Sequence, residues 1–381
     1  MAVKIQINRQ FLVKAAIIFL SVAMVVLTPI ILLDYNIEAS LIKPAVYKQI
    51  LSDQKIYQDV SHLVTEQLIQ QLHAADSEDS KPVFIHITKN SEQILMNLNQ
   101  DELQELISSL MPSEWAQVKL DSLIDQYFAS MNNGIYRPNL LIAMKDIKSR
   151  LQSKTGLSFF VTLIRSQPPC SEAEKQSWLT APLEEAPACF PSETILKESE
   201  PKTSELLDQI AARMPDDASL NYFFGTAGFA PGQPSTVSRL QDSAARFWKA
   251  RIWVRISPTF ILILLFLLGL FHNSARPFTK LWSYPVIFGG LAGLFMSLLL
   301  WPMTQLSINT GLLPKLPESI SPALISTGAG VAKAALARIS PLISIQSILI
   351  TMLGILLFFA DRIGKQKLKI KKPQAKKYTL E

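Results

Sequence analysis

Four long runs of apolar residues constrain this chain more than any other feature. They cover residues 15–33, 252–271, 281–301 and 342–360, and each is 19 to 21 residues long. An α-helix rises about 1.5 Å per residue, so roughly 20 residues cross the ~30 Å hydrocarbon core of a bilayer. We therefore predict a mainly α-helical membrane protein with four transmembrane helices. Residues 34–251 then form one large domain inserted between the first and second of these helices.

The inserted domain is predicted to be α-rich with a little β-structure, an α+β domain. Apolar residues at three-to-four spacing indicate a helix pair over 44–75. Asn99 followed by Glu102 is the sequence of a capping box at a helix start. Asn133-Gly134 is typical of a helix end. Alternating residues indicate a strand over Val83–Thr88, and a second strand is predicted over Leu140–Met144.

The rest of the chain between the apolar runs is predicted from composition. The polar, Pro- and Glu-rich residues 191–204 indicate an exposed loop, followed by a helix over 204–214. From Val237 a helix is expected to continue without a break into the second span. The Pro- and Ser-rich residues 302–341 are expected to form a loop that contains a small-residue helix over 328–338.

The charge distribution predicts the orientation of the chain. Residues 34–255 hold 21 Lys and Arg against 28 Asp and Glu, a net charge of −7. The segments 1–14, 273–280 and 361–381 together hold 13 Lys and Arg against 2 Asp and Glu, a net charge of +11. Short segments rich in Lys and Arg stay in the cytoplasm.

We therefore expect a multi-pass protein of the bacterial plasma membrane with both termini in the cytoplasm. In this arrangement the loop 272–280 and the basic tail 361–381 are cytoplasmic, whereas 34–251 and 302–341 lie outside. A cluster of cations at the outer end of the second span runs against the charge rule, and we expect their side chains to reach the lipid headgroups. These cations are Arg246, Lys249, Arg251 and Arg255.

The first apolar run has two interpretations. Basic residues followed by an apolar run are also typical of a secretory signal peptide. The 19-residue run is longer than the roughly 7–15 apolar residues of such signals, and Asp34-Tyr35-Asn36 follows it without a small-residue cleavage site. We expect an uncleaved anchor, with cleavage as the alternative.

Cys170 and Cys189 are the two cysteines of the chain, and both lie in the segment placed outside. An oxidising compartment and proline residues shortly before each cysteine favour a disulfide that closes this loop. Two unpaired thiols are the alternative. A metal site is disfavoured because no other cysteine or nearby histidine supplies ligands.

No catalytic pattern stands out in the sequence. The four histidines, His62, His73, His86 and His272, are too scattered to suggest a shared metal ion, and there is no HExxH motif, nucleophile elbow or phosphate-binding loop. Almost nothing ionisable lies inside the four runs, which argues against a transporter that carries charged solutes. We therefore expect no enzymatic activity, no metal and no cofactor, and a bundle without a continuous polar cavity.

Two membrane-related patterns do stand out. Gly289 and Gly293 form a GxxxG step in the third run, which predicts close helix packing in lipid, either within the bundle or between two copies. The tail beyond the fourth run is rich in lysine, so we expect it to bind anionic lipid headgroups. The lysines concerned are Lys365, Lys367, Lys369, Lys371 and Lys372.

The motifs Met111-Pro112-Ser113-Glu114-Trp115, Ser166-Gln167-Pro168-Pro169-Cys170 and Cys189-Phe190-Pro191-Ser192-Glu193 resemble those of a group of bacterial four-span membrane proteins without an assigned function. That group carries a Pro-Pro-Cys and Cys-x-Pro-x-Glu pair in an extracytoplasmic domain. The order of one span, a large outer domain and three further spans also resembles the permease subunits of lipoprotein-exporting ABC systems. Those subunits have a longer loop between the second and third spans than residues 273–280 provide.

The sequence thus predicts a non-enzymatic membrane-anchored scaffold or binding protein. Its outer domain would bind a protein, an envelope component or lipid, or mediate self-association. No nucleic-acid partner is expected, because the excess of cations lies outside the inserted domain. The alternative is a permease-like subunit that works with a separate ATPase.

Overall fold

The structure is a computed structural model, and the chain divides into two compact units. The first unit comprises Met1–Ile42, Phe247–Ile308 and Lys333–Glu381, and the second comprises Lys43–Arg246 and Asn309–Ala332. The structure describes residues 9–74, 94, 97–135, 138–180, 183, 186–219, 236–270, 278–312 and 320–370.

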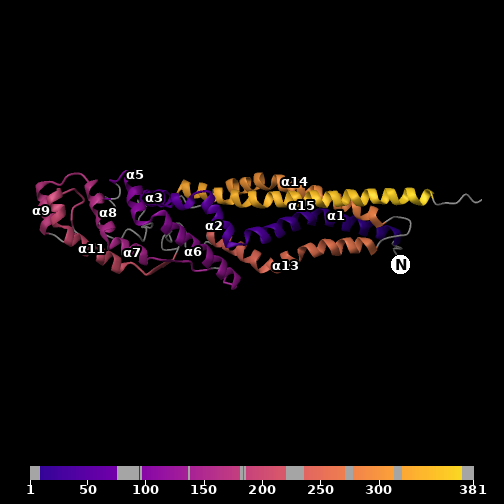
Figure 1. Cartoon of the computed structure of the whole chain (residues 1–381), viewed down its shortest axis with the longest axis horizontal. Helices are drawn as coiled ribbons and strands as arrows, with labels where there is room; N and C mark the ends of the chain where they lie inside the picture. The colour runs from indigo at the N-terminus through magenta and orange to yellow at the C-terminus, as the bar shows by residue number, and fades with distance from the viewer. Residues whose placement is uncertain are drawn as a thin grey trace, which may run out of the picture. The chain divides into compact units, whose positions relative to one another are not determined.

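The first unit is built from four long helices: α1, α14, and the parts of α13 and α15 that follow Arg246 and Ala332 (Figure 1). All four are long and apolar enough to cross a membrane, and they contain most of the four apolar runs. The prediction of a mainly helical, multi-pass membrane protein is confirmed. Their bounds are Arg9–Asn36, Thr236–Leu270, Phe278–Ser307 and Pro322–Ile370, and short π-helical segments over Ile37–Leu41 and Ile308–Leu312 follow α1 and α14.

Small residues set the packing of α1 against α14. A Cβ atom on Gly289 of α14 would lie 3.0 Å from Thr28 Oγ1 of α1, and one on Gly293 would lie 3.2 Å from Leu32 Cδ1. The contacting residue numbers rise together, so the two helices run parallel. Backbones approach this closely only where side chains are absent or small, which is how membrane helices gain packing energy.

Helix α15 packs antiparallel to α14 through a repeat of small residues. Ser340 donates a hydrogen bond to Ser297 O over 3.1 Å, and the hydroxyls of Ser344 and Ser297 lie 2.9 Å apart. Further along, a Cβ on Gly290 would lie 2.8 Å from the carbonyl oxygen of Ser347. A spacing of alternately four and three residues keeps one stripe of a helix facing its neighbour. The stripe on α15 consists of Ser340, Ser344, Ser347, Thr351 and Gly354.

The second unit is a set of shorter helices with one small sheet (Figure 1). Strand β1, Leu141–Ala143, pairs antiparallel with β2, Asp217–Ser219, in the register Ile142 opposite Ala218. The helices are α2 Pro44–Asp53, α3 Ile56–Ala74, α5 Gln100–Leu110, α6 Ser113–Asn132, α7 Lys145–Leu151, α8 Lys154–Arg165, α9 Glu172–Thr180, α10 Glu193–Glu198 and α11 Glu200–Arg213.

Several local predictions for this unit are confirmed. The Asn99 side chain accepts a hydrogen bond from Glu102 N, and the Glu102 carboxylate accepts one from Asn99 N, so the capping box of α5 is complete. Helix α6 ends at Asn132 with Asn133 as its C-cap, and Gly134 follows with φ of 80°, a backbone conformation that glycine adopts without steric cost. The strand predicted over Leu140–Met144 is β1. The strand predicted over Val83–Thr88 lies outside the described residues.

The structure differs from the predicted loop 191–204, which forms α10 and the first turn of α11 instead. Ser192 caps α10 by accepting a hydrogen bond from Ile195 N, and Pro201 lies in the first turn of α11, where its missing N–H costs nothing. Leu196 and Leu207 are buried, so burial of one face outweighs the polar composition of this segment.

The predicted loop 302–341 also differs. Helix α14 continues to Ser307, and the expected short helix over 328–338 is part of α15, which begins at Pro322 and runs through Pro341. Ser321 caps α15 by accepting a hydrogen bond from Leu324 N. Within the second unit, Gln67 accepts a hydrogen bond from Ser321 N and Gln54 donates one to Gly330 O, so the first turns of α15 are held by α2 and α3.

Candidate functional site

The most concentrated polar site of the first unit is an ion-pair cluster around Glu38. The Nε atoms of Arg251 and Arg255 donate to the same carboxylate oxygen, Glu38 Oε1, over 2.8 Å and 2.7 Å. The Glu38 side chain is 9% exposed, whereas that of Arg255 is 57% exposed. The cluster therefore has a buried anion at its centre and a guanidinium at its rim.

Local helix geometry brings these three residues together. Arg251 and Arg255 are four residues apart on α13 and therefore project from one face. Glu38 lies in the π-helical segment that follows α1. A carboxylate withdrawn from water costs several kcal/mol unless it is paired, and two guanidinium groups meet this cost. The cluster thus fastens the end of α1 to α13.

Glu38 was not singled out from the sequence, because it was assigned to the inserted domain. The cations of α13 were interpreted as side chains that reach the headgroups, and Arg251 and Arg255 also have a protein partner. The sequence did contain an indication of this ion pair. Glu38 lies about one helical turn beyond the end of the first apolar run, and a carboxylate so close to a span needs a cation.

Two residues before Glu38, Asn36 forms a carboxamide pair with Gln346 of α15. Asn36, which is buried, donates to Leu32 O over 2.7 Å and to Gln346 Oε1 over 2.8 Å. The Gln346 side chain in turn donates to Asn36 Oδ1 over 3.4 Å. The pair links α1 to α15 and leaves the amide groups of Asn36 satisfied inside the unit. The polar groups of the pair bond to each other, which suits helix packing rather than solute binding.

We expect Glu38→Gln to lower the stability of the full chain by about 1.5–3 kcal/mol, because it removes the charge from two charge-assisted hydrogen bonds. The measurement is thermal unfolding of the detergent-solubilised protein. Glu193→Gln is the matched control, since Glu193 also pairs with an arginine, Arg165, but both side chains are 53% exposed. Surface pairs contribute little, so the control should unfold at nearly the same temperature as the unaltered protein. Equal losses in both variants would contradict the role of Glu38.

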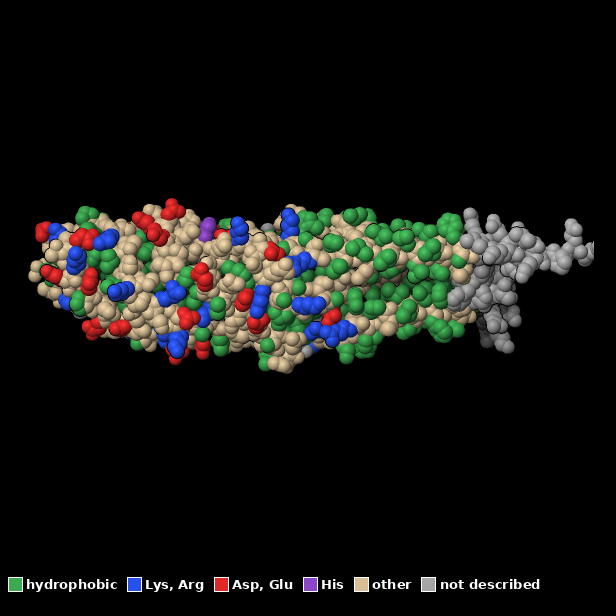
Figure 2. Space-filling view, in the orientation of Figure 1, with side chains coloured by type: hydrophobic (Ala, Val, Ile, Leu, Met, Phe, Trp, Pro, Cys, Tyr) green, Lys and Arg blue, Asp and Glu red, His purple; other side chains and the backbone are tan. Residues whose placement is uncertain are grey.

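An apolar groove lies between α1 and α14 in the first unit. It has a volume of about 540 Å³ and is open to the surroundings. Its walls carry Val22 and Val26 from α1 and Tyr284, Phe288 and Phe295 from α14, all of them well exposed. Figure 2 shows hydrophobic side chains covering this part of the molecule on the face in view, without charged groups. Such a wall suits hydrocarbon and offers nothing that would bind a charged solute.

The second unit contains a polar recess of about 180 Å³ beside α3 and α6. Tyr57 lies in its wall and donates a hydrogen bond to Asp121 Oδ1 over 2.6 Å. Burial raises the pKa of the Tyr57 hydroxyl well above its usual value, and the hydrogen bond to Asp121 raises it further. The hydroxyl therefore stays protonated at neutral pH and links α3 to α6.

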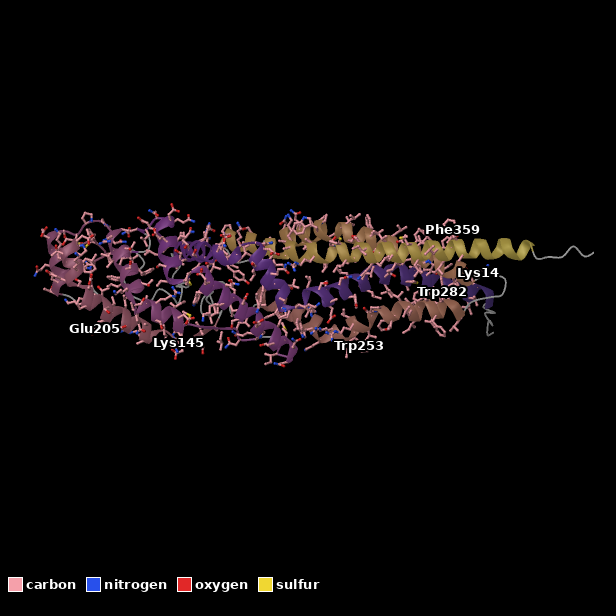
Figure 3. All side chains as sticks on the ribbon, viewed as in Figure 1. Lys14, Lys145, Glu205, Trp253, Trp282 and Phe359 are labelled. Carbon is pink, nitrogen blue, oxygen red and sulfur yellow. A yellow bond between two sulfur atoms is a disulfide. The ribbon has the colours of Figure 1, made fainter. Side chains whose placement is uncertain are left out.

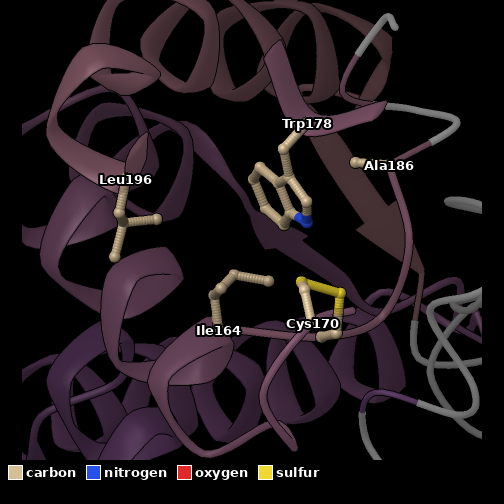
Figure 4. Packing of buried hydrophobic residues seen from close by; sticks show 6 residues of the cluster. Ile164, Cys170, Trp178, Ala186 and Leu196 are labelled. Carbon is tan, nitrogen blue, oxygen red and sulfur yellow. A yellow bond between two sulfur atoms is a disulfide. The ribbon is translucent and has the colours of Figure 1, made fainter. Parts of the chain in front are cut away.

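The predicted disulfide is present at the centre of a small core in the second unit. Cys170 and Cys189 are bonded and buried, and Trp178 from α9 packs beside them at 1% exposure (Figure 4). Cys170 N also donates to Phe190 O, and Phe190 N donates to Pro168 O. The two Pro- and Cys-containing segments are thus joined by backbone as well as by sulfur. The remaining members of the core are Ile164, Ala186 and Leu196.

The other residues singled out by sequence are distributed over the chain. Gly289 and Gly293 lie in helix contacts within the first unit, as described above. His62 lies 3.6 Å from Glu66, and among the described residues no three His, Cys, Asp or Glu side chains converge as a metal site would need. The side chains of Lys365, Lys367 and Lys369 lie outside the description of α15, and Lys371 and Lys372 lie beyond the described residues.

Compared with known proteins, the chain matches no family model, no curated protein and no solved structure. The resemblance of the Pro-Pro-Cys segment to a group of bacterial membrane proteins therefore stays a prediction. The four apolar helices and their packing define the class, a multi-pass helical membrane protein.

Proposed function

We propose that this protein is a membrane-anchored binding or scaffold protein of the bacterial plasma membrane. In this proposal the second unit lies outside the cell and binds a protein, envelope or lipid partner. The observation that carries the proposal is the buried disulfide between Cys170 and Cys189, since such bonds persist in oxidising compartments.

The charge distribution supports this orientation. The net charge of −7 over residues 34–255 contrasts with +11 over the segments 1–14, 273–280 and 361–381. The positive segments all fall on one side of a four-span arrangement, which places them in the cytoplasm. The second unit, Lys43–Arg246 with Asn309–Ala332, then falls on the other side.

The first unit supports an anchoring role over transport. Glu38 and Asn36, two of its buried polar residues, are paired within the protein. Small residues let α14 and α15 pack closely against each other, and the groove beside α1 is apolar. Transport of charged solutes needs polar or ionic groups that face a path at mid-depth in the membrane.

The orientation is tested by labelling introduced cysteines with a maleimide that does not cross membranes. We expect Lys154→Cys, an exposed position of the second unit, to be labelled on intact cells. Lys376→Cys in the tail should be labelled only after the cells are opened. The native cysteines need no removal because they are bonded to each other. Labelling of Lys376→Cys on intact cells would place the tail outside the cell. The proposed orientation, and the proposal with it, would then be wrong.

The permease-like alternative is supported by the order of one span, a large unit and three spans. It is weakened by the connection between α13 and α14, which has only residues 271–277 between the two helices and leaves little room to contact an ATPase. Cross-linking in intact cells, followed by purification in mild detergent, distinguishes the permease-like alternative from the scaffold. A stoichiometric ATPase favours the alternative, whereas cross-links from lysines of the second unit to an envelope component favour the scaffold.

A further inference from the structure

We propose that the guanidinium group of Arg255, held in place by Glu38, binds the phosphate group of an anionic phospholipid at the end of the membrane-spanning helices. This inference requires only that the four helices cross a bilayer. It does not depend on a partner for the second unit.

The first step is the geometry of Arg255. Its Nε atom donates to Glu38 Oε1 over 2.7 Å, which fixes the guanidinium plane. Its side chain is nevertheless 57% exposed. Nε uses only one of the five N–H donors of a guanidinium, so donors at its outer edge remain for a second acceptor. An arginine oriented in this way is prepared for two-point recognition of a phosphate.

The second step is the surroundings of Arg255. Ile252, Trp253 and Ile256 flank it on α13 with exposed fractions of 63%, 64% and 45%. Trp253 lies at the opposite end of the first unit from Lys14, Trp282 and Phe359 (Figure 3). Exposed tryptophan and isoleucine at the end of a membrane helix are typical of the interface between hydrocarbon and headgroups. The acceptor that a membrane supplies at that depth is the phosphate of a lipid.

The third step is the local charge. Arg251 and Arg255 lie one turn apart on α13, and both donate to Oε1 of the same carboxylate, Glu38. A single carboxylate therefore offers one negative charge to two guanidinium groups. A lipid with a net negative headgroup adds a second negative charge beside Arg255, so phosphatidylglycerol should bind more tightly than phosphatidylcholine.

The test is native mass spectrometry of the full chain in mild detergent, titrated with phosphatidylglycerol. We expect Arg255→Gln to weaken binding about tenfold, the loss of one charge-assisted contact. Lys333→Gln is the matched control, because Lys333 is also a cation at a span end, 5.4 Å from the ring of Trp301, and it should bind the lipid as the unaltered protein does. Inorganic phosphate should not compete, which distinguishes a lipid site from a site for free phosphate.

Glu38→Gln separates lipid binding from helix packing. This variant weakens the contact between α1 and α13 but leaves both guanidinium groups charged, and its amide oxygen can still accept a hydrogen bond from Arg255 Nε. Phosphatidylglycerol should therefore bind about as tightly as before. The proposal is overturned if Arg255→Gln retains full binding, or if Glu38→Gln and Arg255→Gln lose binding equally. It is also overturned if Lys333→Gln loses as much, or if inorganic phosphate displaces the lipid.

Discussion

Gly290→Ala is expected to destabilise the first unit by about 3 kcal/mol, the upper end of the usual cost of overpacking. The added Cβ would lie 2.8 Å from both the carbonyl oxygen of Ser347 and the amide nitrogen of Thr351. These are backbone atoms of α15, so no side chain can rotate away and the two helices must separate. The measurement is unfolding of the detergent-solubilised full chain in increasing dodecyl sulfate.

Two other glycines provide graded controls for this prediction. At Gly289 the added atom meets only the side chain of Thr28, at 3.0–3.5 Å, so Gly289→Ala should cost less. At Gly328 nothing lies within 4 Å, and alanine is the better helix former there by roughly 1 kcal/mol, so Gly328→Ala should be neutral or stabilising. If all three variants unfold alike, the contact between α14 and α15 is not as close as described.

Replacement of both cysteines by serine is expected to lower the stability of the second unit by about 3 kcal/mol. Cys170 and Cys189 are 19 residues apart, and the chain-entropy estimate for a loop of that length gives this value. For a unit of roughly 200 residues the unfolding temperature should fall by about 6–12 °C. The measurement is thermal unfolding followed by circular dichroism at matched protein and detergent concentrations.

Reduction of the unaltered protein provides the control for the cysteine variant. A phosphine reductant should lower its unfolding temperature by about the same amount, and should leave the double serine variant unchanged. Serine occupies similar space to cysteine, so the loss should come from the bond rather than from the packing around Trp178. An unfolding temperature unaffected by reduction would contradict the stabilising role of the disulfide.

Prediction from sequence worked best where the structure depends on interactions between residues that are neighbours in the chain. The capping box at Asn99 and Glu102 and the helix end at Gly134 depend on neighbouring residues, and both are present. It failed for residues 191–204, where a polar composition suggested a loop. There the burial of Leu196 and Leu207 favours helices α10 and α11, and a pattern confined to a few residues could not anticipate the surface that buries them.

The candidate site shows the same division. Arg251 and Arg255 were noted as cations that did not suit their position, but Glu38 is separated from them by 213 and 217 residues. The small-residue stripe of α15 is visible in the sequence as a regular spacing, and yet only contact with Gly290 and Ser297 shows which helix it faces. Partners at long sequence separation leave no local pattern.

The sequence by itself determined that this protein has four membrane-length helices and that its two cysteines could close one loop. Both follow from properties of short segments, namely the length of an apolar run and the number of thiols. Only the tertiary structure decided that Glu38 is the partner of Arg251 and Arg255 and that glycines and serines hold α14 against α15. These contacts depend on how distant segments meet, because a buried charge needs a counter-charge and close backbones need small side chains wherever the fold brings them together.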